Sequence, residues 1–163
     1  MEQLLQLGAR IGGGSLGQTP LHIAVRHGFD EVCAVLIDHG ADLEAEDNKG
    51  NTPLLMAIKA GKTALVKQLL ENGANVGPSK KEGNSPLHLA AELGLDNNCA
   101  ALIDHGADLE AEDTEGNTPL LLALKQGHLT TAVLLKEKGA INYTPTSAAS
   151  QVQHFNNVYR YSS

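Results

Sequence analysis

The sequence predicts an all-α repeat solenoid, a single elongated domain in which helix pairs stack side by side. Three observations predict this fold class. A glycine followed by a Thr/Ser-Pro-Leu step recurs four times at intervals of 33 residues, a Gly-Ala pair recurs at the same interval, and the segment LIDHGADLEAED occurs twice unchanged. Self-similarity at such a period is typical of solenoids. The glycines are Gly17, Gly50, Gly83 and Gly116, and the identical segments are Leu36–Asp47 and Leu102–Asp113.

The four phrases are GQTPLH, GNTPLL, GNSPLH and GNTPLL, and each is followed within its unit by a form of LLxxGAD. A 33-residue unit that carries these two motifs resembles the ankyrin repeat. The resemblance covers residues 17 to about 143. It implies two antiparallel helices in each unit, joined to the next unit by a β-hairpin or loop.

The periodicity divides the chain into a stack with two irregular ends. The first segment matches only the end of a unit and predicts an N-terminal partial repeat or cap. The last segment places Val152, Phe155 and Tyr159 at helical spacing, which favours a capping helix over a partner-docking segment. The expected divisions are 1–16 (cap), 17–49, 50–82, 83–115 and 116–148 (ankyrin repeats 1 to 4) and 149–163 (C-terminal tail). Repeats 1 and 3 match closely, as do 2 and 4, which indicates a duplicated pair.

The first helix of each unit is predicted from its ends. In repeat 1, Thr19 is a hydroxyl N-cap and Pro20 occupies the first helical position, which is where proline is favoured. Gly28 supplies the left-handed turn that ends the helix. The expected buried face is Leu21, Ala24 and Val25.

The second helix is expected from about Asp30 to His39, with Gly40 as its stop. Val32, Val35 and Leu36 recur at helical spacing and predict its buried stripe. The following residues are expected to form an exposed acidic loop. No unit buries both faces alone, so stacking must supply the core.

Several residues depart from the repeated pattern. Asn98 and Thr131 occupy a slot that is apolar in repeats 1 and 2, so Asn98 must either find a partner or tilt outward. Lys136 also replaces an apolar residue, which makes repeat 4 the more polar one. Leu55 and Leu121 replace the TPLH histidine, which in the resembling family ties the turns by hydrogen bonding. Repeats 2 and 4 should lack that tie.

Composition excludes several functional classes. The net charge of −7 argues against nucleic-acid binding, which usually uses a basic face. The sequence contains no run of 18 apolar residues, so we expect no membrane span. Its first residues lack the apolar stretch of a signal peptide, so we expect a cytoplasmic protein, and we expect it to be a monomer. Cys33 and Cys99 lie two units apart, on the order of 20 Å, which is too far for a disulfide. We expect both to be reduced and buried.

Catalytic and cofactor sites are poorly supported. Gly12–Thr19 satisfies a glycine-rich pattern, but Gln18 stands where a phosphate-binding loop needs lysine and no preceding strand is predicted. The histidines and cysteines lack short metal-ligand spacing. The acidic clusters lie on exposed loops rather than in a dry pocket. We therefore expect no enzymatic activity, no metal and no cofactor, and keep nucleotide binding at Gly12–Thr19 as a remote alternative.

The resemblance implies partner binding on a concave face, formed by the loops and the exposed side of the first helices. Leu16 and Leu93 are apolar at positions expected to be solvated and are candidate anchors. The expected partner-binding residues are Leu16, Gln18, Arg26, His27, Glu46, Asn48, Lys49, Asn51, Lys59, Lys81, Glu82, Asn84, Glu92, Leu93, Thr114, Glu115, Asn117 and Lys125.

The loops alternate in charge. The first and third are acidic, whereas Lys80 and Lys81 make the second basic. A protein partner with two basic patches roughly 20 Å apart would complement this order. The leading hypothesis is a non-enzymatic protein-interaction module. The alternatives are an inhibitor or regulatory subunit and a host-directed effector of an intracellular bacterium.

Overall fold

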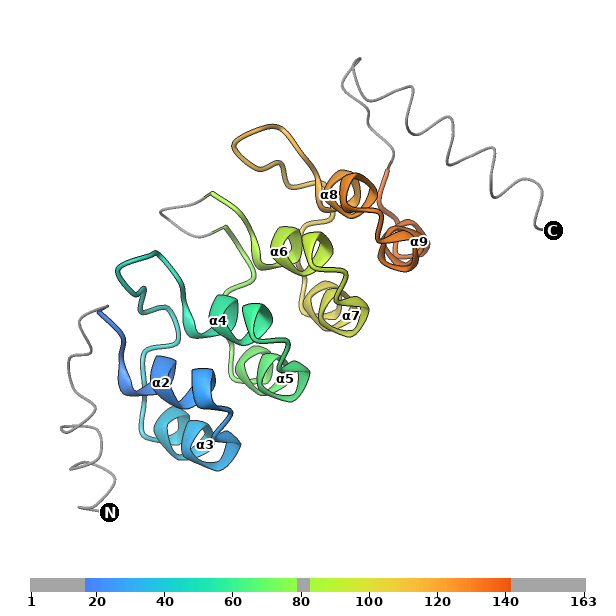
Figure 1. The fold of residues 1–163 in the computed structure, drawn as a ribbon. Coiled ribbons are helices and arrows are strands. Elements are labelled where there is room, and N and C mark those ends of the chain that lie inside the picture. The colour runs from blue at the N-terminus through green and yellow to red at the C-terminus, as the bar shows by residue number, and fades with distance from the viewer. Residues whose placement is uncertain (1–16, 79–82, 142–163) are drawn as a thin grey trace.

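A computed structural model describes residues 17–78 and 83–141. In these residues eight helices form four antiparallel pairs that stack in sequence order (Figure 1). The first helices of the pairs form one layer and the second helices the other, and the connecting loops project from the same side of the stack. The helices are α2 (Pro20–His27), α3 (Asp30–Asp38), α4 (Pro53–Lys59), α5 (Thr63–Glu71), α6 (Pro86–Glu92), α7 (Asp96–Asp104), α8 (Pro119–Gln126) and α9 (Leu129–Glu137).

This arrangement confirms the predicted all-α solenoid and its four helix pairs. The segments between repeats are loops, without strands wherever the structure describes them. The predicted cap at 1–16 and tail at 149–163 lie outside the described residues.

The first helices begin as the sequence predicts. The side chains of Thr19, Thr52, Ser85 and Thr118 each accept a hydrogen bond from a backbone N–H of the first turn, and a proline follows each of them. These caps satisfy donors that a helix terminus otherwise leaves open. α2 ends at Gly28, whose φ of 74° is left-handed and therefore favours glycine.

The core runs through the stack between the two helix layers. Leu21, Ala24 and Val25 are buried as predicted. The predicted stripe of α3 is wrong in part, because Val35 is 36% exposed, whereas Cys33 is fully buried as predicted. α5, an internal second helix, buries Leu65, Val66, Leu69 and Leu70.

Two polar residues of the core differ in how they are accommodated. Thr131 is fully buried, and its hydroxyl donates to Asp96 Oδ1 of the preceding repeat. Asn98 is 1% exposed, and among the described residues neither its carbonyl oxygen nor its amide nitrogen has a partner. It therefore neither tilts outward nor finds the partner that the sequence suggested, and it bears the desolvation cost of a buried amide.

Histidine ties join repeats 1 and 2 and repeats 3 and 4. His22 Nε2 lies 2.8 Å from the carbonyl oxygen of Asn51, and His88 Nε2 lies 3.0 Å from that of Asn117. Leu55 and Leu121 are buried at the equivalent positions and cannot make this bond. The predicted absence of the tie in repeats 2 and 4 is confirmed.

Candidate partner-binding face

The candidate face combines the loops with the first helices, and each acidic loop is held by one carboxylate at its base. Asp47 Oδ1 accepts from the backbone N–H of Lys49 at 2.9 Å and of Asn51 at 2.8 Å. The Asn51 side-chain amide also donates to Asp47. Asp113 and Asn117 repeat the contact in the third loop. The two loops are thus fixed by the same turn.

The electrostatics of these turns follow from their hydrogen bonds. Burial alone would raise the pKa of Asp47, but donation from the Asn51 side chain and from the Asn51 and Lys49 backbone outweighs it and lowers the pKa. Asp113 behaves alike, with burial opposed by Asn117 and the Glu115 backbone. Both carboxylates are therefore structural acceptors that stay charged at neutral pH.

The predicted exposure of Asn51 and Asn117 is wrong. Their side chains are only 6% and 3% exposed, because the aspartates at the loop bases hold them inward. We leave both out of the binding surface.

A second set of hydrogen bonds joins side-chain amides on this face to exposed cationic side chains. Lys59 Nζ donates to Asn51 Oδ1, and Lys125 Nζ donates to Asn117 Oδ1, each at 2.5 Å. In repeat 1, Arg26 Nη1 donates to Gln18 Oε1 at 3.2 Å. The same eight-residue separation recurs in all three pairs, so the first helices of repeats 1, 2 and 4 each hold a cation against a neutral amide.

One glutamate of each acidic loop has an internal role that the sequence analysis did not find. Glu44 Oε1 accepts from the backbone N–H of Asn75 at 2.8 Å, and Glu110 Oε1 accepts from that of Ile141 at 2.7 Å. Each glutamate thus joins its loop to the turn of the next repeat. The sequence offers little to predict this contact, because Glu44 and Asn75 are 31 residues apart. Lys80 and Lys81 of the basic loop lie outside the described residues, so complementarity to basic patches stays a prediction.

The remaining candidates divide by exposure. Arg26, His27, Lys59 and Leu93 are exposed at the ends of the first helices, and Leu93 is 44% exposed. Leu16, Lys81 and Glu82 lie outside the described residues. The other exposed candidates are Asn48, Lys49, Thr114, Glu115 and Lys125, and the partly buried ones are Gln18, Glu46, Asn84 and Glu92.

One exposed aromatic residue was missed. Phe29 is 56% exposed and stacks on the ring of His27, with ring centroids 5.6 Å apart. Phe29 is the N-cap residue of α3. The repeated pattern does not predict an exposed aromatic residue here, because the equivalent residues of the other repeats are Lys62, Leu95 and His128.

Other chemistry finds little support in the described parts of the chain. The two cysteines are free and buried, and burial is the main cause that raises the pKa of Cys33 to about 11 and of Cys99 to about 12. No group of three histidine, cysteine or acidic side chains among the described residues could hold a metal ion. None of the described helices is long and apolar enough to span a bilayer. Thr19, the last residue of the glycine-rich pattern, caps α2 and contacts His22.

Comparison with known protein families gives a match over most of the chain. A family model described as ankyrin repeats (3 copies) matches residues 1–80 and residues 62–147. No curated protein matches the chain. Together the two matches cover the whole stack of helix pairs.

Proposed function

Because this chain belongs to the ankyrin-repeat family, whose members generally mediate protein–protein interaction, we propose that it is a non-enzymatic module that binds a protein partner on the face formed by its loops and first helices. One observation carries the proposal. Hydrogen bonds and burial hold the repeated residues in place, while side chains that differ between repeats, such as Arg26, Lys59 and Leu93, are exposed at the ends of the first helices. Such a surface suits recognition, because a rigid scaffold loses little freedom on binding.

The side chains on this face differ in chemistry from repeat to repeat. At the end of the first helix the four repeats carry Arg26, Lys59, Glu92 and Lys125. Alongside them lie His27 and Leu93, which offer aromatic and apolar contact area. This variety on a constant frame is what specific recognition needs, since charge order selects partners and suppresses wrong ones.

Differential capture tests the proposal. The intact chain is immobilised in three forms: unchanged, with Arg26, Lys59, Leu93 and Lys125 changed to alanine, and with four exposed outer-layer residues changed to alanine. The outer set is Glu31, Lys67, Glu71 and Asp104. We expect the first set to remove a reproducible group of captured proteins and the outer set to retain it. Equal loss with both sets, or retention with both, would place binding elsewhere.

An inhibitor or regulatory subunit, and a host-directed effector, are forms of the same activity that differ in the partner. The captured proteins would distinguish them. Nucleotide binding through Gly12–Thr19 is tested separately by thermal shift with ATP, GTP and NAD, where reproducible stabilisation would favour it over the interaction module.

A further inference from the structure

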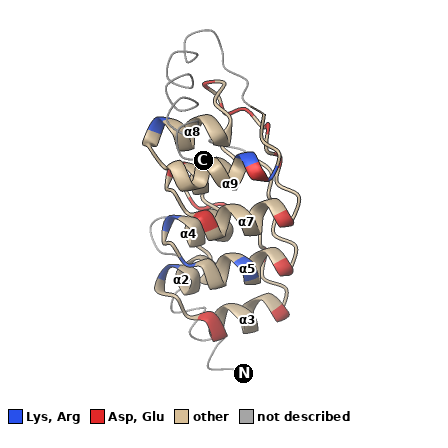
Figure 2. Cartoon of the chain, turned by 90° about the vertical axis from the view of Figure 1, so that its right-hand side faces the viewer, with Lys and Arg blue, Asp and Glu red and all other residues tan. Residues whose placement is uncertain are grey.

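A row of equivalent side chains runs along the first-helix layer with an uneven charge order. We call it the ridge, and it consists of Arg26, Lys59, Glu92 and Lys125, one residue from each repeat. From repeat 1 to repeat 4 the charges are positive, positive, negative and positive. Figure 2 shows the basic C-terminal ends of α2, α4 and α8 along one edge, and the acidic C-terminal ends of α3, α5 and α7 along the opposite edge. The ridge is thus a basic strip on a chain whose net charge is −7.

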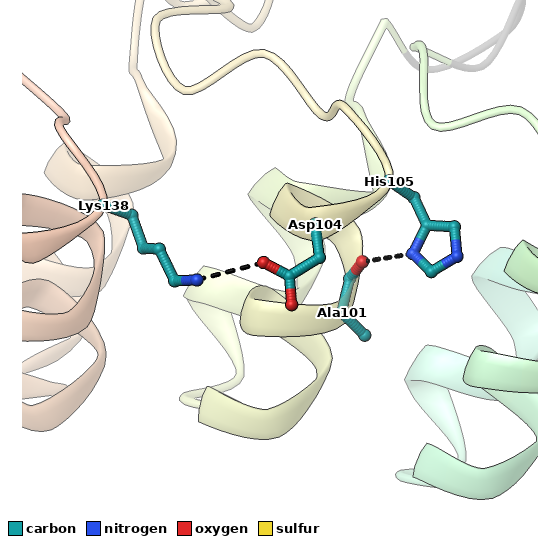
Figure 3. Close-up of polar contacts among 4 residues, drawn as sticks. All are labelled: Ala101, Asp104, His105 and Lys138. Carbon is teal, nitrogen blue, oxygen red and sulfur yellow. Dashed lines mark hydrogen bonds and ion pairs between the residues drawn. The ribbon is translucent and has the colours of Figure 1, made fainter.

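The ridge cations are oriented by neutral groups. Arg26, Lys59 and Lys125 each donate to an amide oxygen, which fixes the side chain without pairing it with a carboxylate. The other arrangement also occurs in this chain, since Lys138 pairs with Asp104 at 3.0 Å (Figure 3). It is the one ion pair found among residues 17–78 and 83–141. Asp47 and Asp113 lie beyond the amides, at the bases of the loops.

In repeat 3 the acidic Glu92 interrupts the strip of cations, and an exposed apolar side chain follows it. Leu93 caps the end of α6 and is 44% exposed, directly after Glu92. Its repeat lies between those that carry Lys59 and Lys125. An apolar contact at this point would be flanked by positive charge on both sides.

The spacing of the ridge sets the register of a ligand. Stacked helices lie roughly 8–10 Å apart, and an extended chain advances about 3.3 Å per residue. One repeat therefore corresponds to about three residues of an extended ligand. A ligand that matches the ridge would therefore carry acidic residues at positions 1, 4 and 10, opposite the cations of repeats 1, 2 and 4. It would carry an apolar residue at position 7, opposite Leu93 of repeat 3.

We propose that the partner presents an extended acidic segment that lies along the ridge, with carboxylates facing Arg26, Lys59 and Lys125 and an apolar side chain on Leu93. The inference rests on the proposed function and adds the chemistry and register of the partner. Long-range attraction would steer such a segment to the ridge, so binding should weaken as salt is raised.

Fluorescence anisotropy with a labelled peptide tests the register. The probe is a 12-residue Gly/Ser peptide with glutamate at positions 1, 4 and 10 and leucine at position 7, and the control has the same composition with its three glutamates adjacent. With the intact protein we expect the spaced peptide to bind about fivefold more tightly than the control, since only it can meet all three cations. Equal binding of the two peptides would contradict the proposed spacing of the acidic residues. Tighter binding of a peptide with lysine in place of glutamate would contradict the proposed acidic character of the ligand.

Matched variants test the residues. Changing both Lys59 and Lys125 to glutamate turns attraction into repulsion and should weaken binding about tenfold, while Lys67→Glu on α5 makes the same type of charge change off the ridge and should have less than about a twofold effect. Lys59→Gln with Lys125→Gln keeps a hydrogen-bond donor on each side chain and should weaken binding without unfolding. Lysine at peptide position 4 should restore binding to Lys59→Glu. Equal effects of the ridge variants and Lys67→Glu would overturn the proposal.

The outcome is distinguishable from failure of the proposed function. Suppose that the variant with Arg26, Lys59, Leu93 and Lys125 changed to alanine loses captured proteins, but the protein binds the spaced and control peptides equally. The face then binds partners of another chemistry, and only the ridge proposal fails. If neither assay depends on the face, both fail.

Discussion

Asn98 buries a whole carboxamide without a partner among the described residues, in a slot that holds Leu65 in repeat 2. Changing Asn98 to leucine removes two unsatisfied polar atoms and adds apolar contact, so we expect the free energy of unfolding to rise by about 1–2 kcal/mol. Urea denaturation measures the change. Asn117→Leu is the matched control, because that amide is also buried but is bonded to Asp113 and Lys125, and it should be destabilising. A loss of stability with Asn98→Leu would show that the side chain has a partner.

Asp47 and Asp113 give the stability a predictable pH dependence. Their pKa values are lowered in the folded state by hydrogen bonds that outweigh burial. The stability they contribute is fully present above the unfolded pKa, about 3.9 for aspartate, and is lost as the pH falls through the lower folded pKa. Unfolding free energies measured from pH 6 to pH 2.5 should therefore decrease with acidification.

The double change Asp47→Asn and Asp113→Asn should reduce that slope and lower the stability at pH 7, since an asparagine cannot accept with two charged oxygens. Glu112→Gln, on an exposed loop residue, is the control and should change neither by much. An unchanged pH dependence in the double variant would mean that other carboxylates carry the acid sensitivity.

At the scale of the element, the turn into α8 depends on one side chain. His88 contacts the Ser85 hydroxyl with Nδ1, at 2.7 Å, and the Asn117 carbonyl with Nε2. It therefore caps its own helix and ties it to the next repeat. His88→Leu, which copies the residue found in repeats 2 and 4, should cost about 1–3 kcal/mol, because the backbone groups it serves are buried.

Lys138→Ala is the comparison for the histidine tie. It removes the inter-repeat ion pair with Asp104, in which the Lys138 side chain is 37% exposed and the Asp104 side chain 62% exposed. Exposed ion pairs contribute between about 0 and 1 kcal/mol. Chemical denaturation of both variants should separate the two kinds of link. A Lys138→Ala loss as large as that of His88→Leu would contradict the ranking.

How far the sequence predicts these elements depends on whether the cause is local. The helix starts at Thr19 and Pro20 and the stop at Gly28 follow from the conformations that these residues prefer, and the structure confirms them. The burial of Asn51 depends on Asp47 at the base of its loop, and the role of Glu44 depends on a turn 31 residues away. Periodicity locates such positions on a repeat but does not say which neighbour each side chain reaches.

At the scale of the molecule, the helices repeat every 33 residues but the polar ties repeat every 66. His22 and His88, Asp47 and Asp113, Glu44 and Glu110, and Lys59 and Lys125 make the same contacts in repeats 1–2 and 3–4. The junction between repeats 2 and 3 has Leu55 in place of the histidine. Among the residues that the structure describes, which leave out 79–82 of this junction, the stack therefore consists of two tied pairs joined through apolar contacts. This agrees with a duplicated pair of repeats.

This apolar junction is expected to be strong rather than weak. A typical hydrogen bond adds only about 0.5–1.5 kcal/mol net, whereas burying one large apolar side chain adds about 1.5–3 kcal/mol. α4 and α5 bury Leu54, Leu55, Ile58, Leu65 and Leu69 almost completely. The missing tie is thus more than offset by apolar burial in repeat 2.

Hydrogen exchange followed by mass spectrometry tests this balance. We expect the slowest exchange in peptides from α4 and α5, and faster exchange in α3 and α9, whose described cores are smaller and where Val35 and Leu129 are exposed. Stability in a solenoid is approximately a sum of repeat and neighbour-interface contributions, so the best-buried internal repeat should open last. Fast exchange at the facing sides of repeats 2 and 3, with slow exchange within each tied pair, would instead show that the histidine ties outweigh apolar burial and that the molecule opens at its centre.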